Sequence, residues 1–327
     1  MSMTRAELQD AARRAFGEGG LAADAGKSWS LIAEMGWLMM AVPEDQGGLG
    51  LGSEATGVIH TELGRALVPG PAIAQMLVIE ALSAADGLAE RDDLLARAIG
   101  GEVMTASLAG AGATGLLRCV PDADRASHVI VVEPTRVMLT PLANLPITPR
   151  ETWDKTRRLF DIRLHETPNG LVLAEGDAAT ALAERLEAQL LFALAGDSLG
   201  GADAILALTI DYLKLRHQFS RPLALFQALK HRVANMKTWL SASEALFWSR
   251  ASDTAAALPE LGALKAHATS VYRIIAEDTV QLHGGIGLTM EHHCHLFLKR
   301  AMLNCALGGD NDHWEEQAGR QALTASA

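Results

Sequence analysis

The sequence contains few cysteines and fewer basic than acidic residues. Its three cysteines (Cys119, Cys294 and Cys305) form no CxxC pair and are odd in number, which favours a reducing, cytoplasmic compartment over a disulfide framework. The 28 Lys and Arg residues face 39 Asp and Glu residues, for a net charge of -11. Nonspecific binding to nucleic acid or to an anionic membrane is therefore not expected, although a local basic patch could bind a phosphorylated small molecule.

The chain also lacks segments typical of membrane or secreted proteins. The N-terminal MSMTRAELQDAARRAF has no apolar signal core, and no uninterrupted apolar run reaches membrane-spanning length. There is no internal repeat and no low-complexity segment. With 327 residues, of which 49% are hydrophobic, the chain can build a large buried core and two or three domains.

The spacing of apolar residues predicts helices in the first hundred residues. Apolar side chains recur every three or four residues in four segments: 6–16, 28–40, 53–67 and 72–85. VPEDQGGLGLGS, between the second and third segments, is expected to be a turn, with Ser53 capping the next helix. A dinucleotide fingerprint is less favoured there, because that motif requires a preceding strand.

The pattern changes near Glu102 and again near Asp177. Short β-branched segments separated by Pro, Asn, Asp and Gly predict a small antiparallel β-domain from about 102 to 173. From Asp177 the spacing predicts a helix whose apolar residues lie on nearly all of its faces, as in a helix buried inside a bundle or an oligomer. Further helices are predicted at 223–251, 259–282 and 291–307. The predicted fold is mainly α with a small β-domain, in three parts: residues 1–101, 102–175 and 176–327.

RHQFSRPLALFQALKH (216–231) gathers positive charge where two predicted helices meet. Its cationic side chains are Arg216, Arg221, Lys230 and His231. A turn followed by a helix N-terminus with this charge suits a phosphate or pyrophosphate, and Gln227 could hydrogen-bond a heterocycle. The alternative is a solvated basic turn with Phe219 and Phe226 in the core.

QLHGGIG (281–287) ends a predicted helix in glycines, whose backbone could approach a ligand closely or could simply end the helix. EHHCHLF (291–297) looks like a metal cluster, but adjacent helical residues point in different directions. His292 and His295 are the pair that could share an ion, and no metal site is expected.

LNCALGGDNDHW (303–314) stops a helical run at two glycines. The stretch is either part of an active site or only a helix end. Asp310, Asp312 and His313 are interpreted as solvated residues at the C-terminus of that helix.

Taken together, these stretches resemble an acyl-CoA dehydrogenase over nearly the whole chain. EMGWLMMAVPEDQGGLGLG, followed by TELGRALVPGP, is similar to the family's first helical domain. LGGADAILALTIDYLKLRHQFSRPLALFQALKHRVANM and QLHGGIGLTMEHHCHLFLKRA are similar to two motifs of its C-terminal domain. Arg, Phe and Gln at offsets of three and eleven, then Gln with Gly-Gly three and four residues on, form a specific combination.

The resemblance implies a tetrameric flavoprotein with an α-helical domain, a β-domain and a four-helix domain that builds the oligomer. Its reaction is α,β-desaturation of an acyl-CoA thioester: a carboxylate removes the α-proton while the β-hydrogen leaves as hydride to FAD. Electron-transfer flavoprotein is the usual electron acceptor. Carried over by position, the residues that contact the FAD of a neighbouring subunit are Arg216, Phe219, Gln227, Gln281, Gly284 and Gly285.

The chain departs from the family pattern where the catalytic base is expected. In much of the family a Glu follows the second motif in a Tyr-Glu-Gly turn, and this position falls on Gly308. The family's other base position, early in the first C-terminal helix, falls on Leu190. Glu187 lies nearly one turn earlier and Glu184 another turn back, so only a small shift of register would make Glu187 the base.

A second departure lies in the β-domain. The family's Thr-Glu-Pro stretch and Lys-x-Trp-Ile-Thr strand cradle the flavin ring, and neither occurs in SLAGAGATGLLRCVPDADRASHVIVV. This absence suggests a shortened β-domain whose own flavin-ring site is weakened or lost.

Three hypotheses remain open. The leading one is that the chain is the shorter subunit of a heteromeric α2β2 acyl-CoA dehydrogenase, some of which act on CoA thioesters of sterol side chains. It would complete the FAD site, and a longer homologous subunit would supply the Glu. The second is a self-sufficient homo-oligomer with Glu187 or another group as base, and the third is a non-catalytic scaffold.

Overall fold

The computed structural model describes residues 4–85, 87–165, 170–252 and 256–325. The chain divides into two compact units, each assembled from separate stretches. The helical unit comprises Met1–Leu21, Gly57–Val68 and Leu191–Ala327. The mixed unit comprises Ala22–Thr56 and Pro69–Leu190.

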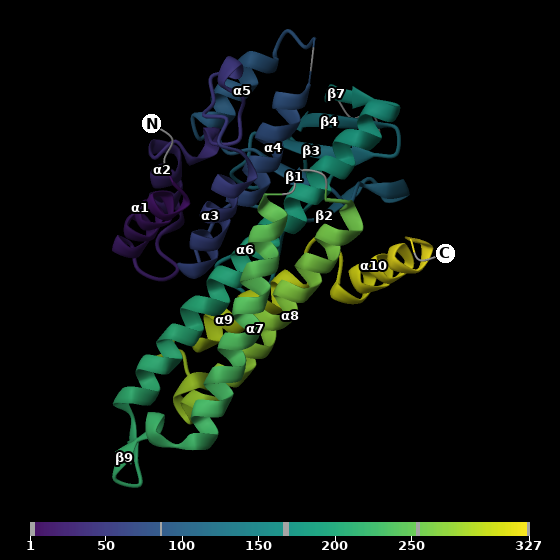
Figure 1. Cartoon of the computed structure of the whole chain (residues 1–327). Helices are drawn as coiled ribbons and strands as arrows, with labels where there is room; N and C mark the ends of the chain where they lie inside the picture. The colour runs from purple at the N-terminus through teal and green to yellow at the C-terminus, as the bar shows by residue number, and fades with distance from the viewer. Residues whose placement is uncertain (1–3, 86, 166–169, 253–255, 326–327) are drawn as a thin grey trace. The chain divides into compact units, whose positions relative to one another are not determined.

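The helical unit is dominated by long helices (Figure 1). They are α1 (Arg5–Glu18), most of α6 (Asp177–Leu215), α7 (Gln227–Ala251), α8 (Leu258–His283), α9 (Cys294–Ala306) and α10 (Asn311–Ala325). Shorter elements are β8 (His217–Gln218), β9 (Arg221–Pro222) and the 3-10 helices η4 (Leu223–Leu225) and η5 (Gly284–Leu288). α8 packs against α7, α9 and α10, so it is buried along much of its length.

The predicted helices of this unit are confirmed, with one addition. α6 begins at Asp177, where the helical pattern was expected to return, and α8 begins and ends within one residue of its predicted bounds, 259–282. The added helix is α10, which was not predicted because the acidic residues at its start suggested an exposed segment. Asp310 begins it: its side chain accepts the N–H of His313 at 2.8 Å. The interpretation of Asp310, Asp312 and His313 as C-terminal residues of the preceding helix was therefore wrong.

α6 is long and apolar enough, by length and composition alone, to cross a membrane. Of its most apolar window, 83% is buried inside the protein. Core helices of water-soluble proteins show the same combination, in agreement with the prediction of a helix enclosed by other helices.

The mixed unit combines helices with two β-sheets. Its helices are α2 (Ala25–Glu34), α4 (Ala72–Ala84), α5 (Arg91–Ile99) and the start of α6, with 3-10 helices η1 (Trp37–Met39), η2 (Glu44–Gln46) and η3 (Gly112–Thr114). α3 (Gly52–Arg65) belongs mainly to the helical unit. Gly36 takes a left-handed conformation at φ 69° and breaks the helix predicted over 28–40. α3 starts at Gly52, so Ser53 lies inside the helix rather than capping it.

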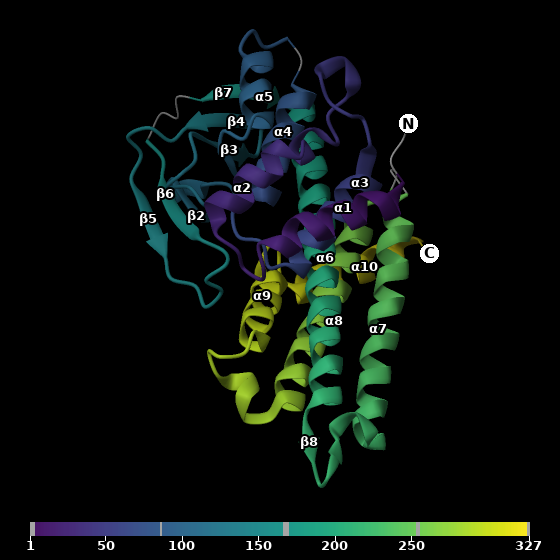
Figure 2. The ribbon, with the colours of Figure 1, turned by 90° about the vertical axis from the view of Figure 1, so that its left-hand side faces the viewer.

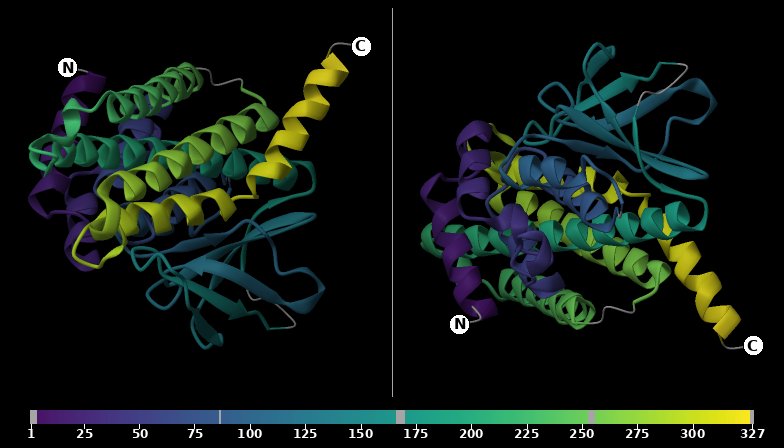
Figure 3. Two further views of the ribbon diagram at one scale, coloured as in Figure 1. Left: turned by 90° about the horizontal axis from the view of Figure 1, so that it is seen from below. Right: turned by 90° about the horizontal axis from the view of Figure 1, so that it is seen from above.

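The sheets are ordered β1-β3-β4-β7 and β2-β6-β5. Figure 3 shows their strands, in blue to teal, from below and from above. The strands are β1 (Thr105–Ser107), β2 (Leu116–Pro121), β3 (His128–Glu133), β4 (Arg136–Pro141), β5 (Ile147–Arg150), β6 (Leu159–Arg163) and β7 (Leu171–Glu175). Apolar side chains from both sheets, including Leu117, Val131 and Ile162, share one buried cluster. The two sheets therefore bury a common core. The prediction of a wholly antiparallel domain was wrong, because β1 pairs with β3 in parallel.

Candidate functional site

The hairpin between α6 and α7 presents an aromatic side chain to solvent. Phe219 and Ser220 have φ of 53° and 60°, as a tight two-residue turn between β8 and β9 requires. This backbone is strained for a residue as large as Phe. Phe219 is 86% exposed, and its ring meets the edge of Phe226 at 6.1 Å. The alternative that Phe219 belongs to the core is therefore wrong.

The basic side chains predicted around this turn are exposed. Arg216, Lys230 and His231 are all solvent-accessible, whereas Arg221 stacks on Phe226, with its guanidinium carbon 3.9 Å from the ring centroid. Gln227 is the first residue of α7, and among the residues that the structure describes no side chain caps this helix end. The first N–H groups of α7 thus face the same region as the cations, which is the arrangement of an anion site.

The glycine turn after α8 is open. Gly284 takes φ 65° and ψ −141°, a conformation that only glycine adopts readily. A Cβ built on Gly284 or on Gly285 would meet no atom within 4 Å. Gln281, on the last turn of α8, is exposed. A ligand can therefore reach this backbone from outside the chain.

Contacts between helix ends bring the two motifs to the same end of the helical unit (Figure 2). The Tyr212 hydroxyl, near the end of α6, donates to the carbonyl of His283 at 3.2 Å. The two rings stack with their centroids 4.3 Å apart. Arg232 of α7 also pairs with Asp278 of α8 at 2.5 Å. The hairpin and the glycine turn, distant in sequence, thus form one exposed end of the bundle.

The turn after α9 contains the position where the base was expected. Gly308 and Gly309 have φ of 67° and 87°, values that disfavour any side chain. The carbonyl of Gly308 accepts the indole N–H of Trp314 at 2.7 Å. The carbonyl of Gly309 accepts from the Lys265 ammonium at 2.7 Å. This turn is built around glycine, and Gly308 and Gly309 themselves have no side chain that could accept a proton. The carboxylate of Asp310, which follows them, caps the start of α10.

Lys265 was missed in the sequence, although a lone Lys in the apolar run LGALKAHAT marks it. It is fully buried and also donates to the carbonyl of Cys305 at 2.9 Å and to Asn311 Oδ1 at 3.3 Å. It thereby joins the end of α9 to the start of α10. Burial lowers the pKa of Lys265 from 10.5 to about 8.

This shift predicts that stability rises in alkaline solution. Between pH 8 and 10.5 the unfolded chain holds a proton on Lys265 that the folded protein has released, so the free energy of unfolding increases with pH. Between pH 8 and 10.5 the free energy of unfolding should rise by up to roughly 3 kcal/mol. Urea unfolding at pH 8 and 10 should show this rise in the native chain and not in Lys265→Met. Equal slopes in both proteins would contradict the assignment.

The mixed unit contains a cavity of about 740 Å³. It is lined by the loop after β1, the end of β3 and the first turns of α6: 108–113, 132–134, Ala179, Thr180, Ala183, Glu184 and Glu187. Glu187 is half-buried there. Leu190, the family's alternative base position, is not among the described lining residues. The lining includes three carboxylates (Glu133, Glu184 and Glu187) and, among the described residues, no Lys or Arg.

Comparison with known proteins identifies the family. Its two domain descriptions match most of the chain: "Acyl-CoA dehydrogenase, N-terminal domain" over residues 2–102 and "Acyl-CoA dehydrogenase, C-terminal domain" over residues 191–323. The acyl-CoA dehydrogenase IpdE2 of Mycobacterium tuberculosis is 36% identical over 279 residues, which cover 84% of this chain and 79% of that protein. The chain belongs to the acyl-CoA dehydrogenase family, whose members are FAD-dependent oxidoreductases.

Solved structures agree with the fold. One described as the "Tcur3481-Tcur3483 steroid ACAD G363A variant" has a TM-score of 0.86 at 25% identity and covers 99% of both chains. The ChsE4-ChsE5 complex from Mycobacterium tuberculosis also has a TM-score of 0.86, at 20% identity over 99% of both chains. An acyl-CoA dehydrogenase from Bacillus anthracis complexed with FAD has a TM-score of 0.84 at 18% identity, covering 100% of this chain and 68% of that one. The mainly α architecture with a small β-region is thus confirmed.

Proposed function

We propose that this chain is the FAD-completing subunit of a heteromeric acyl-CoA dehydrogenase that desaturates an acyl-CoA thioester. The observation that carries the proposal is Gly308: the family's usual base position holds a glycine, which has no proton-accepting group, at a φ of 67° that disfavours a side chain. At the same time, the end of the bundle keeps the residues expected to contact FAD. A longer homologous subunit would supply the catalytic Glu, in an α2β2 assembly.

The exposed end of the bundle fits a dinucleotide held between subunits. Arg216 and the N–H groups of Gln227 and Ala228, the first two residues of α7, would hold phosphate oxygens. Gln227 and Gln281 would hydrogen-bond the cofactor, Phe219 would pack on it, and the bare backbone of Gly284 and Gly285 would leave it room. These side chains lie open to solvent in the single chain, as a site shared with a second subunit requires. Bound there, FAD supplies the hydride acceptor of the reaction.

The cavity of the mixed unit suits a flavin less well. It lacks the family's ring-cradling motifs, and its three carboxylates would repel the negative charge that a flavin gains on reduction. An apolar acyl group would find a better match in its alanine-rich lining, which also includes Leu108. The steroid description of the solved neighbour favours a sterol-like acyl group, and electron-transfer flavoprotein is the expected electron acceptor.

A second candidate function is a self-sufficient homo-oligomeric dehydrogenase. It is favoured by Glu187, which lines the 740 Å³ cavity and could remove a proton from a substrate bound there.

Acyl-CoA turnover separates the two candidates. The chain purified alone should be inactive, and activity should appear with the longer subunit and persist in Glu187→Gln. Glu184→Gln, one turn away in the same cavity, is the matched control. Turnover by the chain alone that is lost in Glu187→Gln but kept in Glu184→Gln would replace the heteromeric proposal with the homo-oligomeric one.

Gly285 provides a test of the cofactor surface. Gly285→Ala adds one methyl group that meets no described atom within 4 Å beyond its own chain neighbours, so the free energy of unfolding should change by less than about 0.5 kcal/mol. In the complex the same methyl should weaken FAD binding by about tenfold, because it fills space at the bare backbone. Thermal unfolding and FAD titration measure the two effects separately. Unchanged FAD affinity would remove Gly285 from the site.

A further inference from the structure

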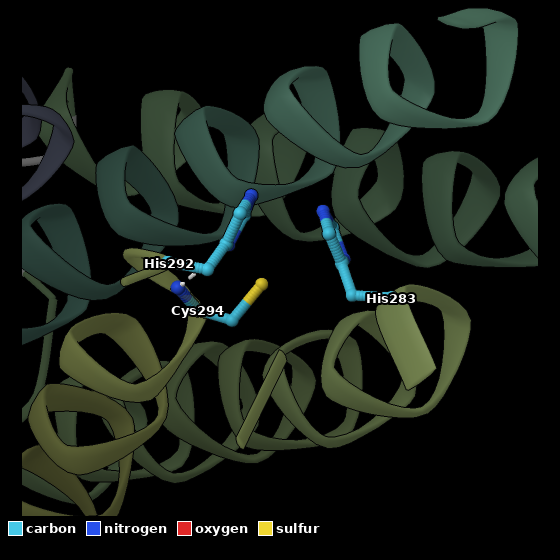
Figure 4. Close-up of side chains that lie close together, drawn as sticks. All are labelled: His283, His292 and Cys294. Carbon is cyan, nitrogen blue, oxygen red and sulfur yellow. Dashed lines mark hydrogen bonds between the residues drawn. The ribbon is translucent and has the colours of Figure 1, made fainter. Parts of the chain in front are cut away.

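Three potential metal ligands converge where α8 passes through η5 into α9 (Figure 4). They are His283, His292 and Cys294, and their ligand atoms all lie within 4.8 Å of one another. His283 ends α8 and Cys294 begins α9, so the glycine turn brings together residues that one helix would keep apart. His283 lies outside the run 291–297 that resembles a metal cluster in the sequence.

His283 is oriented as metal-binding histidines are. Its Nδ1–H donates to the carbonyl of Thr279 at 2.8 Å, which leaves the lone pair on Nε2. The residue is 97% buried, since 3% of it is exposed, and within the described part of the chain Nε2 has no hydrogen-bond partner. A backbone carbonyl that fixes the tautomer and leaves the other nitrogen directed into a buried site is the usual arrangement around a metal-bound histidine.

Cys294 and His292 complete the set. Cys294 is fully buried, so it is not a reactive surface thiol. His292 accepts the backbone N–H of Cys294 at 3.3 Å through Nδ1. This bond is long, and the N–H belongs to the first turn of α9, where unpaired groups are common. Binding a metal through this Nδ1 in place of the N–H would therefore cost little.

Ordinary packing does not explain the cluster fully. The rings of His283 and His292 lie 4.3 Å apart and both contact Tyr212, as stacked aromatic side chains in a core would. Packing alone, however, leaves the buried Nε2 of His283 unsatisfied, which is unfavourable. A metal ion would satisfy it.

We propose that His283, His292 and Cys294 bind a zinc ion, with the fourth position taken by water. Two imidazoles and one thiolate suit zinc, whereas magnesium and calcium prefer oxygen ligands. On binding, the ion replaces the thiol proton, which is released to solvent. The bound ion would tie the end of α8 to the start of α9 and hold the Gly284–Leu288 turn between them.

The test uses the full chain, stripped of metal with a chelator, and either cobalt(II) or zinc alone. One equivalent of cobalt should bind and give the near-ultraviolet charge-transfer band of a cobalt–thiolate bond. Zinc should abolish this band and raise the thermal unfolding midpoint. Cys294→Ala should lose both effects, and His292→Gln should weaken binding at least tenfold. The matched controls Cys119→Ser and Cys305→Ser change the other two cysteines, and both should keep the band.

Three results would overturn the proposal. The first is a native chain with neither a thiolate band nor a zinc-dependent rise in the unfolding midpoint. The second is binding that survives in Cys294→Ala, or that is lost equally in Cys305→Ser. The third is full cobalt affinity in folded His292→Gln. This variant decides the question if circular dichroism shows that Cys294→Ala does not fold, because the His292 side chain is only half-buried.

Discussion

Arg216→Ala is expected to lower the FAD affinity of the complex with the longer subunit by about 10- to 100-fold. Charge-assisted hydrogen bonds to a phosphate contribute roughly 1.5–3 kcal/mol each, and 1.4 kcal/mol corresponds to a factor of ten. Because Arg216 is exposed in the single chain, its removal should leave folding unchanged. Titration of FAD into the flavin-free complex, followed by flavin fluorescence, measures the loss.

Lys214→Ala is the matched control for Arg216. Lys214 is an exposed cation two residues earlier on α6, paired with Asp211 at 3.0 Å, and it lies outside the predicted set. Its removal should change the FAD affinity by less than about twofold. Equal losses in the two variants would indicate a general effect of charge, and unchanged affinity in Arg216→Ala would count heavily against the cofactor site.

Arg300→Met is expected to destabilise the protein by about 3–5 kcal/mol, the largest effect on stability of any variant considered. Arg300 and Asp197 are both fully buried, and Nη1 of Arg300 lies 3.1 Å from Asp197 Oδ1. Removing one partner leaves the other charge inside the core of the helical unit. Urea unfolding of the native chain and the variant gives the difference.

Two further variants show whether charge burial is the cause. Arg300→Met combined with Asp197→Asn should recover much of the loss, because Asn304, which donates to Asp197 Oδ2 at 2.8 Å, can still bond the amide oxygen. Arg320→Met breaks an exposed pair with Glu316 and should cost less than about 0.5 kcal/mol. A loss below 1 kcal/mol in Arg300→Met would refute the account of this pair.

Sequence periodicity predicted the long helices because their apolar residues face neighbouring helices at a fixed repeat. It failed where the backbone conformation of a single residue, or pairing with a strand distant in sequence, determines the structure. Gly36 ends a helix whose apolar pattern continues beyond it, and the parallel pairing of β1 with β3 depends on strand order, which no local pattern records. α10 was missed because an acidic residue such as Asp310 fits a solvent-exposed tail as well as it fits the N-terminal cap of a helix.

The candidate sites divide in the same way. Arg216, Phe219 and the glycine turn could be singled out because each belongs to a contiguous motif, and their role in binding FAD stays a prediction. The structure adds that Tyr212 and His283 hold these motifs at one end of the bundle. The cluster of His283 with His292 and Cys294 could not be predicted, since the path of the turn between two helices determines which side chains meet.

The visible absorption spectrum of the purified chain, with FAD added and unbound flavin then removed, tests the central proposal most directly. The chain alone should stay colourless, and flavin should be retained only after co-purification with a longer homologous subunit. Stoichiometric flavin on the chain alone that bleaches with an acyl-CoA would contradict the half-site proposal and direct attention to Glu187. A chain that stays colourless with every such partner would contradict it as well and leave the scaffold hypothesis.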